Sequence, residues 1–153
     1  MKELLEYRVF LVARLGQAAK EFCEACEVCD PSTKVSGEWT AHQVAFHLRE
    51  INRLVYDVRV RQILREENPL FENFDPEEWM AVHYDSQEEF KKIFSEFKTN
   101  VDSLCSVLSA VPNEAWSRLS QHKILGDGLT MQLWVEYGLA HIEEHLVEIR
   151  RGV

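Results

Sequence analysis

Hydrophobic residues recur about every 3.6 positions along almost the whole chain, and no segment shows sustained alternation of hydrophobic and polar residues. This pattern predicts an all-α fold with four long amphipathic helices. The expected helices run from Lys2 to Val28, from Thr40 to about Glu67, from Ser86 to about Ala110, and from Thr130 to Arg151. The segments between them are rich in polar residues and contain all four prolines, so they read as connections.

Helix-start signals support three of these boundaries. Thr40 with Gln43 and Ser86 with Glu89 each fit a capping box, and Thr130 supplies an N-cap for the last helix. The connections 69–85 and 112–128 are expected to be irregular. Each of them contains one short helical turn, at Pro76–Trp79 and at Asn113–Trp116.

The lengths of the connections favour a particular four-helix bundle. A short loop makes the first two helices antiparallel neighbours, whereas residues 69–85 are numerous enough to return along the bundle. The result is an up-down-down-up order with a long crossover between the second and third helices; a plain up-down bundle is the alternative. At 153 residues the chain has the size of a single domain, expected to span residues 1–153.

The same hydrophobic period predicts which side of the second helix faces the core. Its expected buried residues are Val44, Leu48, Ile51, Leu54, Val55 and Val58. Three arginines follow on the same helix, and we interpret Arg59, Arg61 and Arg65 as a solvated face.

Composition narrows the range of partners and locations. The formal net charge is −9 and the basic residues form no long run, so nucleic acid is not expected as a partner. No apolar stretch approaches the roughly 20 residues of a membrane span, and acidic residues interrupt the N-terminus, so neither a membrane nor a signal peptide is expected. We therefore expect a cytoplasmic protein with reduced cysteines.

Three of the four cysteines are closely spaced. Cys23, Cys26 and Cys29 form C-x2-C-x2-C, which matches part of an iron–sulfur ligand run, but the fourth cysteine of that run is missing. The segment also reads as the end of the first helix, so we interpret these residues as small buried thiols of the core.

Three histidines form the most informative pattern in the chain. His141 and His145 are four residues apart and project from one face of the last helix, while His47 lies on the inward face of the second helix. Three imidazoles with positions left open are typical of a catalytic metal site. His42 is expected to point away from His47, and His83 and His122 lie in irregular segments without a favourable spacing.

Residues around the histidines suggest further roles. Gly138, one turn before His141, would leave space for a pocket with Trp134 as its wall, or would serve helix packing. Glu144 is a candidate to orient an imidazole, with a solvated acid as the alternative. The pattern His-x-x-Glu-His also occurs in a peptidase class, but too few residues follow His145 to supply its later ligand. A di-iron site lacks the required Glu-x-x-His pairs.

Two motifs resemble the DinB/YfiT-like superfamily of metal-binding four-helix bundles. They are WTAHQVAFHL at residues 39–48, and GLTMQLW at residues 128–134 running into YGLAH and His145. The Phe74-Asp75 and Trp79 region and the phenylalanine-rich third helix also fit. The resemblance implies an up-down-down-up bundle, a homodimer, and a divalent metal on His47, His141 and His145.

The resemblance leaves the activity open. It implies a metal-dependent transferase of low-molecular-weight thiols or a metal-dependent hydrolase, in which the metal activates a thiol or a water. Zinc or nickel is the expected metal because imidazole suits both, and a thiol cosubstrate is expected in the first case. No catalytic side chain can be identified beyond the metal ligands. The alternative is a stress-related protein that binds a metal or a small ligand without turnover.

Overall fold

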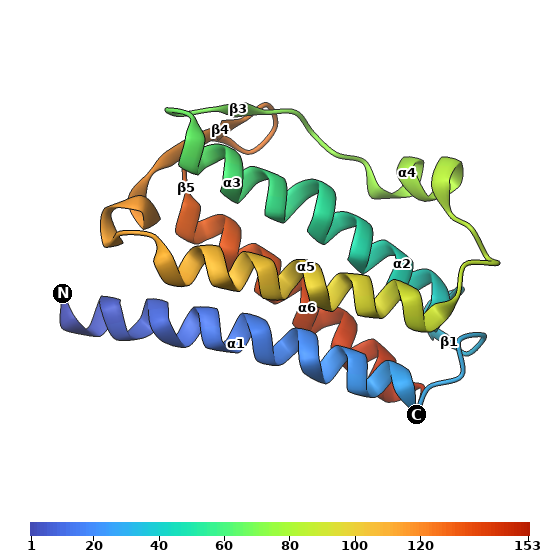
Figure 1. Ribbon diagram of the computed structural model, residues 1–153. Helices are drawn as coiled ribbons and strands as arrows, with labels where there is room; N and C mark the ends of the chain where they lie inside the picture. Colours follow the sequence, from blue (N-terminus) through green and yellow to red (C-terminus); the bar gives the residue numbers. More distant parts are fainter.

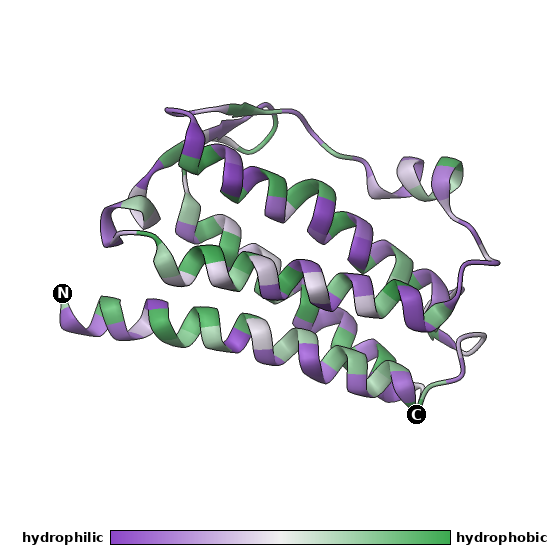
Figure 2. Ribbon diagram, in the orientation of Figure 1, coloured by the Kyte–Doolittle hydropathy of each residue, from purple (hydrophilic) through white to green (hydrophobic).

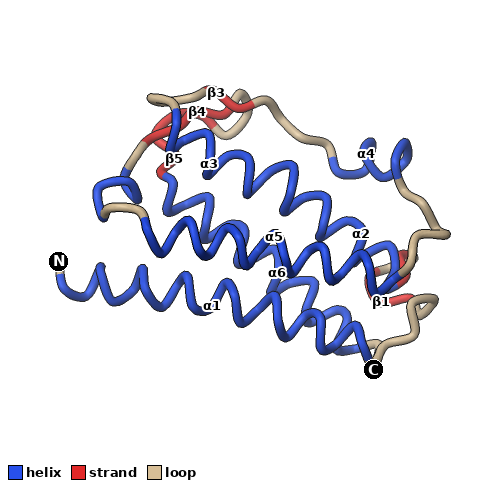
Figure 3. Tube along the Cα trace, viewed as in Figure 1, coloured by secondary structure: helices blue, strands red, loops and turns tan.

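Long helices form most of the molecule in the computed structural model, which describes residues 1–153 (Figures 1 and 3). The long helical segments predicted from the hydrophobic period are present. They are α1 (Lys2–Glu27), the continuous segment α2 (Ala41–Ile51), η1 (Asn52–Tyr56) and α3 (Asp57–Arg65), then α5 (Phe90–Ala110) and α6 (Met131–Arg151). No helix combines the length and apolar composition that crossing a bilayer requires.

The four segments pack around one core. α1 packs against α5 and α6, and the segment from α2 to α3 also packs against α5 and α6. In Figure 1, α1 and α6 run towards the end of the bundle that carries the C-terminus, whereas α2–α3 and α5 run the opposite way. The connection from α3 to α5 returns along the bundle and contains α4 (Pro76–His83).

The connections are more ordered than expected, because they contain short strands. β1 (Lys34–Ser36) pairs with β2 (Trp39–Thr40) in an antiparallel hairpin. A second sheet joins β3 (Leu70–Phe71), β4 (Leu119–His122) and β5 (Gly126–Thr130). Strands of two to five residues are too short to produce a detectable alternation in the sequence. The expected helical turns are present as α4 and η2 (Asn113–Ser117).

Side-chain caps fix the starts of two long helices as predicted. The Thr40 hydroxyl accepts a hydrogen bond from the Gln43 amide, and the Gln43 side chain accepts one from the Thr40 amide, which completes the capping box of α2. The Thr130 hydroxyl accepts from the Leu133 amide at the start of α6. Such caps each contribute about 1 kcal/mol to helix stability.

The capping box predicted at Ser86 and Glu89 is wrong, because α5 begins only at Phe90 and has no side-chain cap. The preceding residues are held by α2 instead. Arg49 forms a bidentate ion pair with Glu88 (2.7 and 2.8 Å), and Nε2 of His42 donates to the Glu88 carbonyl at 2.7 Å. These contacts keep the backbone before Phe90 out of the helix.

The core lies between the amphipathic faces of the long helices (Figure 2). Phe22 and Phe97 meet edge to face at its centre, with ring centroids 5.4 Å apart. Cys23, Cys26 and Cys29 are buried free thiols, in agreement with their interpretation as core residues. Burial raises the pKa of Cys23 to about 12, and its Sγ donates to the carbonyl of Phe94.

A π-helical segment changes the register of the second long helix. η1 accommodates one residue more per turn than an α-helix, which rotates the following side chains by about 100° about the axis. Val58, expected in the core, is therefore exposed, whereas Arg59, expected on a solvated face, is buried. Arg61 is half-buried in an ion pair with Asp57, and only Arg65 fits the expected exposure.

Candidate metal centre

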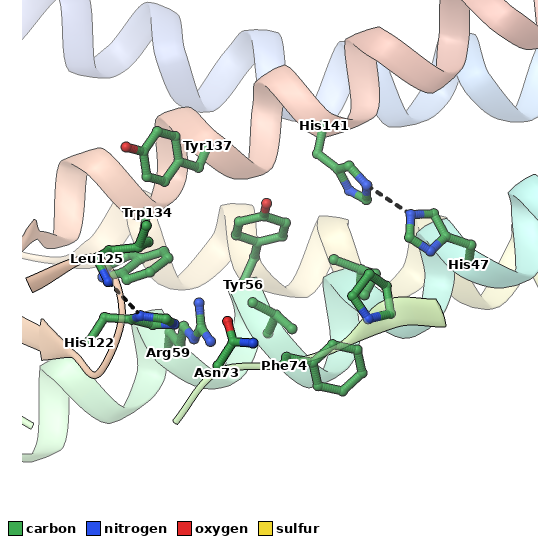
Figure 4. A pocket seen from close by; sticks show the side chains of 13 residues that line it. His47, Tyr56, Arg59, Asn73, Phe74, His122, Leu125, Trp134, Tyr137 and His141 are labelled. Atoms are coloured by element: carbon green, nitrogen blue, oxygen red, sulfur yellow. Dashed lines mark hydrogen bonds between the residues drawn. The ribbon is translucent and has the colours of Figure 1, made fainter. Parts of the chain in front are cut away.

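Three histidine side chains from two helices meet beside the core. His47 lies on α2, and His141 and His145 lie on α6. The Nε2 atoms of His47 and His145 are each 3.0 Å from Nε2 of His141 (Figure 4 draws the first of these contacts). One nitrogen of each ring lies within 4.8 Å of the others. The structure thus brings together all three histidines that the sequence singled out.

Glu148 holds the ring of His145. Its carboxylate accepts a hydrogen bond from Nδ1 of His145 at 2.7 Å and another from the Ser36 hydroxyl at 3.0 Å. Because a carboxylate can only accept, the proton of a neutral His145 lies on Nδ1, and its Nε2 presents a lone pair to the other two histidines. This is the tautomer and orientation that metal ligation requires.

The environment also favours the neutral form of the other two histidines. Burial and repulsion from His145 lower the pKa of His47 to about 4, and the same two causes with repulsion from His47 lower the pKa of His141 to about 2. Neutral imidazoles offer lone pairs, whereas protonated ones cannot bind a metal.

These residues fit a divalent ion. Three Nε2 atoms converge, and neighbouring imidazoles cannot all satisfy one another by hydrogen bonds. Nδ1 of His141 is buried without a hydrogen-bond partner, so nothing else in the protein fixes that ring through its second nitrogen. A cation between the three nitrogens would satisfy the lone pairs. Neutral imidazole is a borderline ligand that suits zinc, nickel and related metals.

No further side chain joins the three histidines as a candidate ligand. His42 points away, as predicted, and accepts from the Tyr84 hydroxyl at Nδ1 (2.6 Å). His83 is exposed and stacks on Trp79, and Asp75 caps α4 by accepting from the amides of residues 77 and 78. These two side chains of the crossover are therefore engaged away from the three histidines.

A pocket of about 270 Å³ lies beside the histidines (Figure 4). Its lining residues come from α2, η1, α3, the start of the crossover, the β4–β5 turn and α6. They are His47, Ile51, Val55, Tyr56, Arg59, Asn73, Phe74, Pro76, His122, Leu125, Trp134, Tyr137 and His141. Because His47 and His141 belong to this wall, a ligand in the pocket would reach the candidate metal position directly.

The structure decides between the alternatives left open for Gly138 and Glu144. Trp134 does line the pocket, but the space beside Gly138 is filled by Tyr56, whose Cγ would lie 3.3 Å from a Cβ at that position. Gly138 thus serves helix packing. Glu144 is exposed, and the acid that orients an imidazole is Glu148, which sequence reasoning missed although it stands three residues after His145.

Arg59 and His122 are two further polar residues of the pocket. Neither was predicted to line it: Arg59 was placed on a solvated face, and His122 had no favourable spacing. Arg59 was assigned to the surface because the α-helical period was continued through η1 without its extra residue. His122 ends β4, and its strand pairing with Phe71 brings it to the pocket. No sequence signal predicted that pairing.

The structure is similar to that of YfiT from Bacillus subtilis, described as a probable metal-dependent hydrolase with an unusual four-helix bundle topology. The TM-score is 0.86 at 19% sequence identity, over 95% of this chain and 85% of that chain, so the similarity is one of fold. No curated protein matches the sequence significantly. The sequence model of the DinB superfamily matches residues 13–149, and the chain therefore belongs to the DinB superfamily.

Proposed function

We propose that this protein is a divalent-metal-dependent enzyme that acts on a small molecule, with hydrolysis as the leading reaction. The observation that carries the proposal is the convergence of three Nε2 atoms in the wall of a pocket, with no fourth protein ligand. Structural zinc sites are normally closed by four protein ligands, whereas catalytic ones leave a position free. The description of YfiT as a probable metal-dependent hydrolase supports the same reading.

In this proposal His47, His141 and His145 hold the ion. When bound, a divalent ion supplies Lewis acidity, which lowers the pKa of a coordinated water or thiol and polarises a substrate carbonyl. Zinc or nickel is the proposed metal because both accept imidazole ligands. Glu148 keeps Nε2 of His145 directed at the site, and Trp39 packs against the His47 ring with centroids 5.2 Å apart.

Tyr56 is the pocket side chain best placed to assist. It packs beside His141, with ring centroids 5.9 Å apart, and burial raises the pKa of its hydroxyl. Tyr56 therefore remains protonated at neutral pH and can donate a hydrogen bond to an oxygen that gains negative charge. Its hydroxyl forms no hydrogen bond within the protein, which leaves that donor free for a ligand.

The alternative reaction is transfer of a low-molecular-weight thiol, because a metal held by the same three histidines would equally activate a thiol. The topology and assembly implied by the family resemblance belong to the proposal as well. The helix directions in Figure 1 support an up-down-down-up order. A homodimer stays a prediction, to be measured by light scattering.

The test combines metal content with turnover. Purified protein is analysed for metals, then stripped with chelator and reloaded with zinc or nickel. Release of nitrophenolate from a small nitrophenyl ester is measured with and without a low-molecular-weight thiol, in wild type and in His141→Ala. Metal-dependent release that His141→Ala abolishes supports the enzyme, and a requirement for the thiol would favour transfer. One bound metal without metal-dependent turnover of any substrate offered would favour the non-catalytic binding protein.

A further inference from the structure

Arg59 is a buried cation without an acidic partner. The residue is only 8% exposed, yet no carboxylate lies within ion-pair distance of its guanidinium. One of its terminal nitrogens donates to the main-chain carbonyl of Glu72 at 3.0 Å. The Glu72 carboxylate points elsewhere and pairs with Lys123 at 2.6 Å. A buried charge is costly when nothing compensates it, so an unpaired one in a pocket wall calls for an explanation.

Aromatic rings fix the position of this guanidinium. Its central carbon lies 4.6 Å from the ring centroid of Trp134 and 5.4 Å from that of Phe71. Trp134 is itself held, because its indole N–H donates to the Ser120 hydroxyl at 2.8 Å. Because the two rings are nearly perpendicular to each other, they contact the guanidinium from different sides and hold it in place. The N–H groups along the edge of the guanidinium stay available for hydrogen bonds. Only one donor on that edge is used within the protein.

His122 offers a second donor beside Arg59 (Figure 4). Its Nδ1 accepts hydrogen bonds from the amides of Ile124 and Leu125, at 3.0 and 3.1 Å. Two donors on Nδ1 require a lone pair there, so the ring proton lies on Nε2. Both hydrogen bonds of the His122 ring within the protein involve Nδ1, so Nε2 is left without a partner there. A neutral His122 therefore presents an N–H group at the same end of the pocket.

The pocket contains no acidic residue at all, although the chain as a whole has a net charge of −9. Arg59 is its only cationic side chain, because the histidines are neutral, and the amide of Asn73 lies next to it (Figure 4). Hydrogen-bond donors thus gather at one end of the pocket, and the three-histidine site lies at the other. The remaining lining is mostly hydrophobic.

From this arrangement we infer that the pocket binds a small organic acid, whose carboxylate is held by Arg59 with help from His122. The inference rests on the proposed function in one respect, namely that the bound acid is the substrate. Its carboxylate would then lie away from the metal position, and its reacting group would lie beside the metal position. The planar guanidinium edge matches a carboxylate through paired hydrogen bonds. The volume of about 270 Å³ restricts the ligand to a small molecule, and the hydrophobic lining favours an apolar body between the two ends.

The test measures binding rather than turnover, and it uses metal-free protein so that the acid cannot bind through a metal. Phenylacetate and its uncharged counterpart phenylacetamide are the probes, titrated calorimetrically into wild type, Arg59→Met and Lys123→Met. Lys123 is a matched control because it is a half-exposed cation directly after His122 that does not line the pocket. Metal content of each protein, measured separately after reloading, reports on the proposed function.

Wild type is expected to prefer phenylacetate over phenylacetamide, and Arg59→Met to weaken phenylacetate binding by about 10- to 100-fold, as for a lost charge-assisted hydrogen bond. Lys123→Met should change it by less than about fivefold. Equal affinity for acid and amide, or equal affinity of wild type and Arg59→Met for the acid, overturns the inference. Failure to bind metal would sink the proposed function while leaving these binding results intact.

A measurement on wild type covers the case in which Arg59→Met does not fold. The Nε–Hε resonance of Arg59 in ¹⁵N-labelled protein should shift on addition of phenylacetate and stay in place with phenylacetamide. An unmoved Arg59 resonance at an excess of phenylacetate overturns the inference independently of any variant.

Discussion

His145 donates its Nδ1 proton to the carboxylate of Glu148, one helical turn further along α6, over 2.7 Å. Ser36, from the β1–β2 hairpin, donates to the other oxygen of the same carboxylate at 3.0 Å. A connection between α1 and α2 thereby helps to orient a histidine at the opposite end of the sequence. Glu148 and Ser36 thus orient a candidate metal ligand without being ligands themselves. Their contribution can be tested without replacing any of the three histidines.

Replacing Glu148 with alanine should weaken metal binding by about 10- to 100-fold, as expected when the partner of a ligating histidine is lost. The reason is that His145 would then no longer be held in the tautomer that directs Nε2 at the metal. Competition with a metal indicator measures the affinity. Glu144→Ala is the control, because it removes the same charge from an exposed position on the same helix. Equal losses of metal affinity in both variants would show that the effect comes from the change in net charge and not from the hydrogen bond to His145.

Purified protein should contain about one equivalent of a divalent transition metal per chain, held by His47, His141 and His145. Alanine at any one of them leaves two ligands and should lower metal content severely. Elemental analysis of the three variants measures this, with His83→Ala as a control because that histidine is exposed and lies outside the cluster. Undiminished metal in all three ligand variants would refute the assignment.

The sequence predicted the histidine cluster because its geometry is mostly local. His145 follows His141 at the fourth position, and the helical period alone puts the two on one face. His47 could be assigned to the inward side because it precedes η1, so the hydrophobic period was still in register there. The long helices and two of their three predicted capping signals were accessible for the same reason.

Arg59 and His122 could not be predicted because they depend on non-local events. One extra residue in η1 turns Arg59 into the bundle and Val58 out of it. The apolar side chain of Val58 continued the unshifted pattern in the sequence, although the buried Val60 and Ile63 follow the shifted one. His122 reaches the pocket through the parallel pairing of β3 with β4, which joins segments about fifty residues apart. The missed start of α5 has a similar cause, since Arg49 on α2 holds Glu88.

Two glycines in long helices should respond differently to alanine. At Gly16 a Cβ would lie 3.7 Å from Sγ of Cys105, an ordinary contact, so Gly16→Ala should raise the free energy of unfolding by up to about 1 kcal/mol. At Gly138 the Cβ would lie 3.3 Å from the Tyr56 ring, which must move, so Gly138→Ala should gain less or destabilise. Urea unfolding of both variants measures the difference. A larger gain at Gly138 would show that the Tyr56 contact is loose.

Acid should lower the free energy of unfolding through the histidine cluster even when no metal is bound. The folded-state pKa of His47 is lowered from 6.5 to about 4 by burial and by repulsion from His145, and that of His141 to about 2. In the unfolded chain both return to about 6.5. Below pH 6.5 the unfolded state therefore binds more protons than the folded state. The contribution of the two neutral histidines to the free energy of unfolding is present above pH 6.5 and is lost as pH falls towards 4.

The loss attributable to His47 should be about 2 kcal/mol between pH 7 and pH 4.5 in metal-free protein. Urea unfolding across this range measures it, and His47→Gln should show a correspondingly shallower dependence because glutamine does not titrate. Glu88 does not interfere, since its pKa is lowered to about 2 by Arg49 and its contribution is lost only below about pH 4.5. In metal-loaded wild type the fall should steepen, because the ion leaves as protons bind. Identical pH dependence in wild type and His47→Gln would show that His47 is not desolvated as its burial implies.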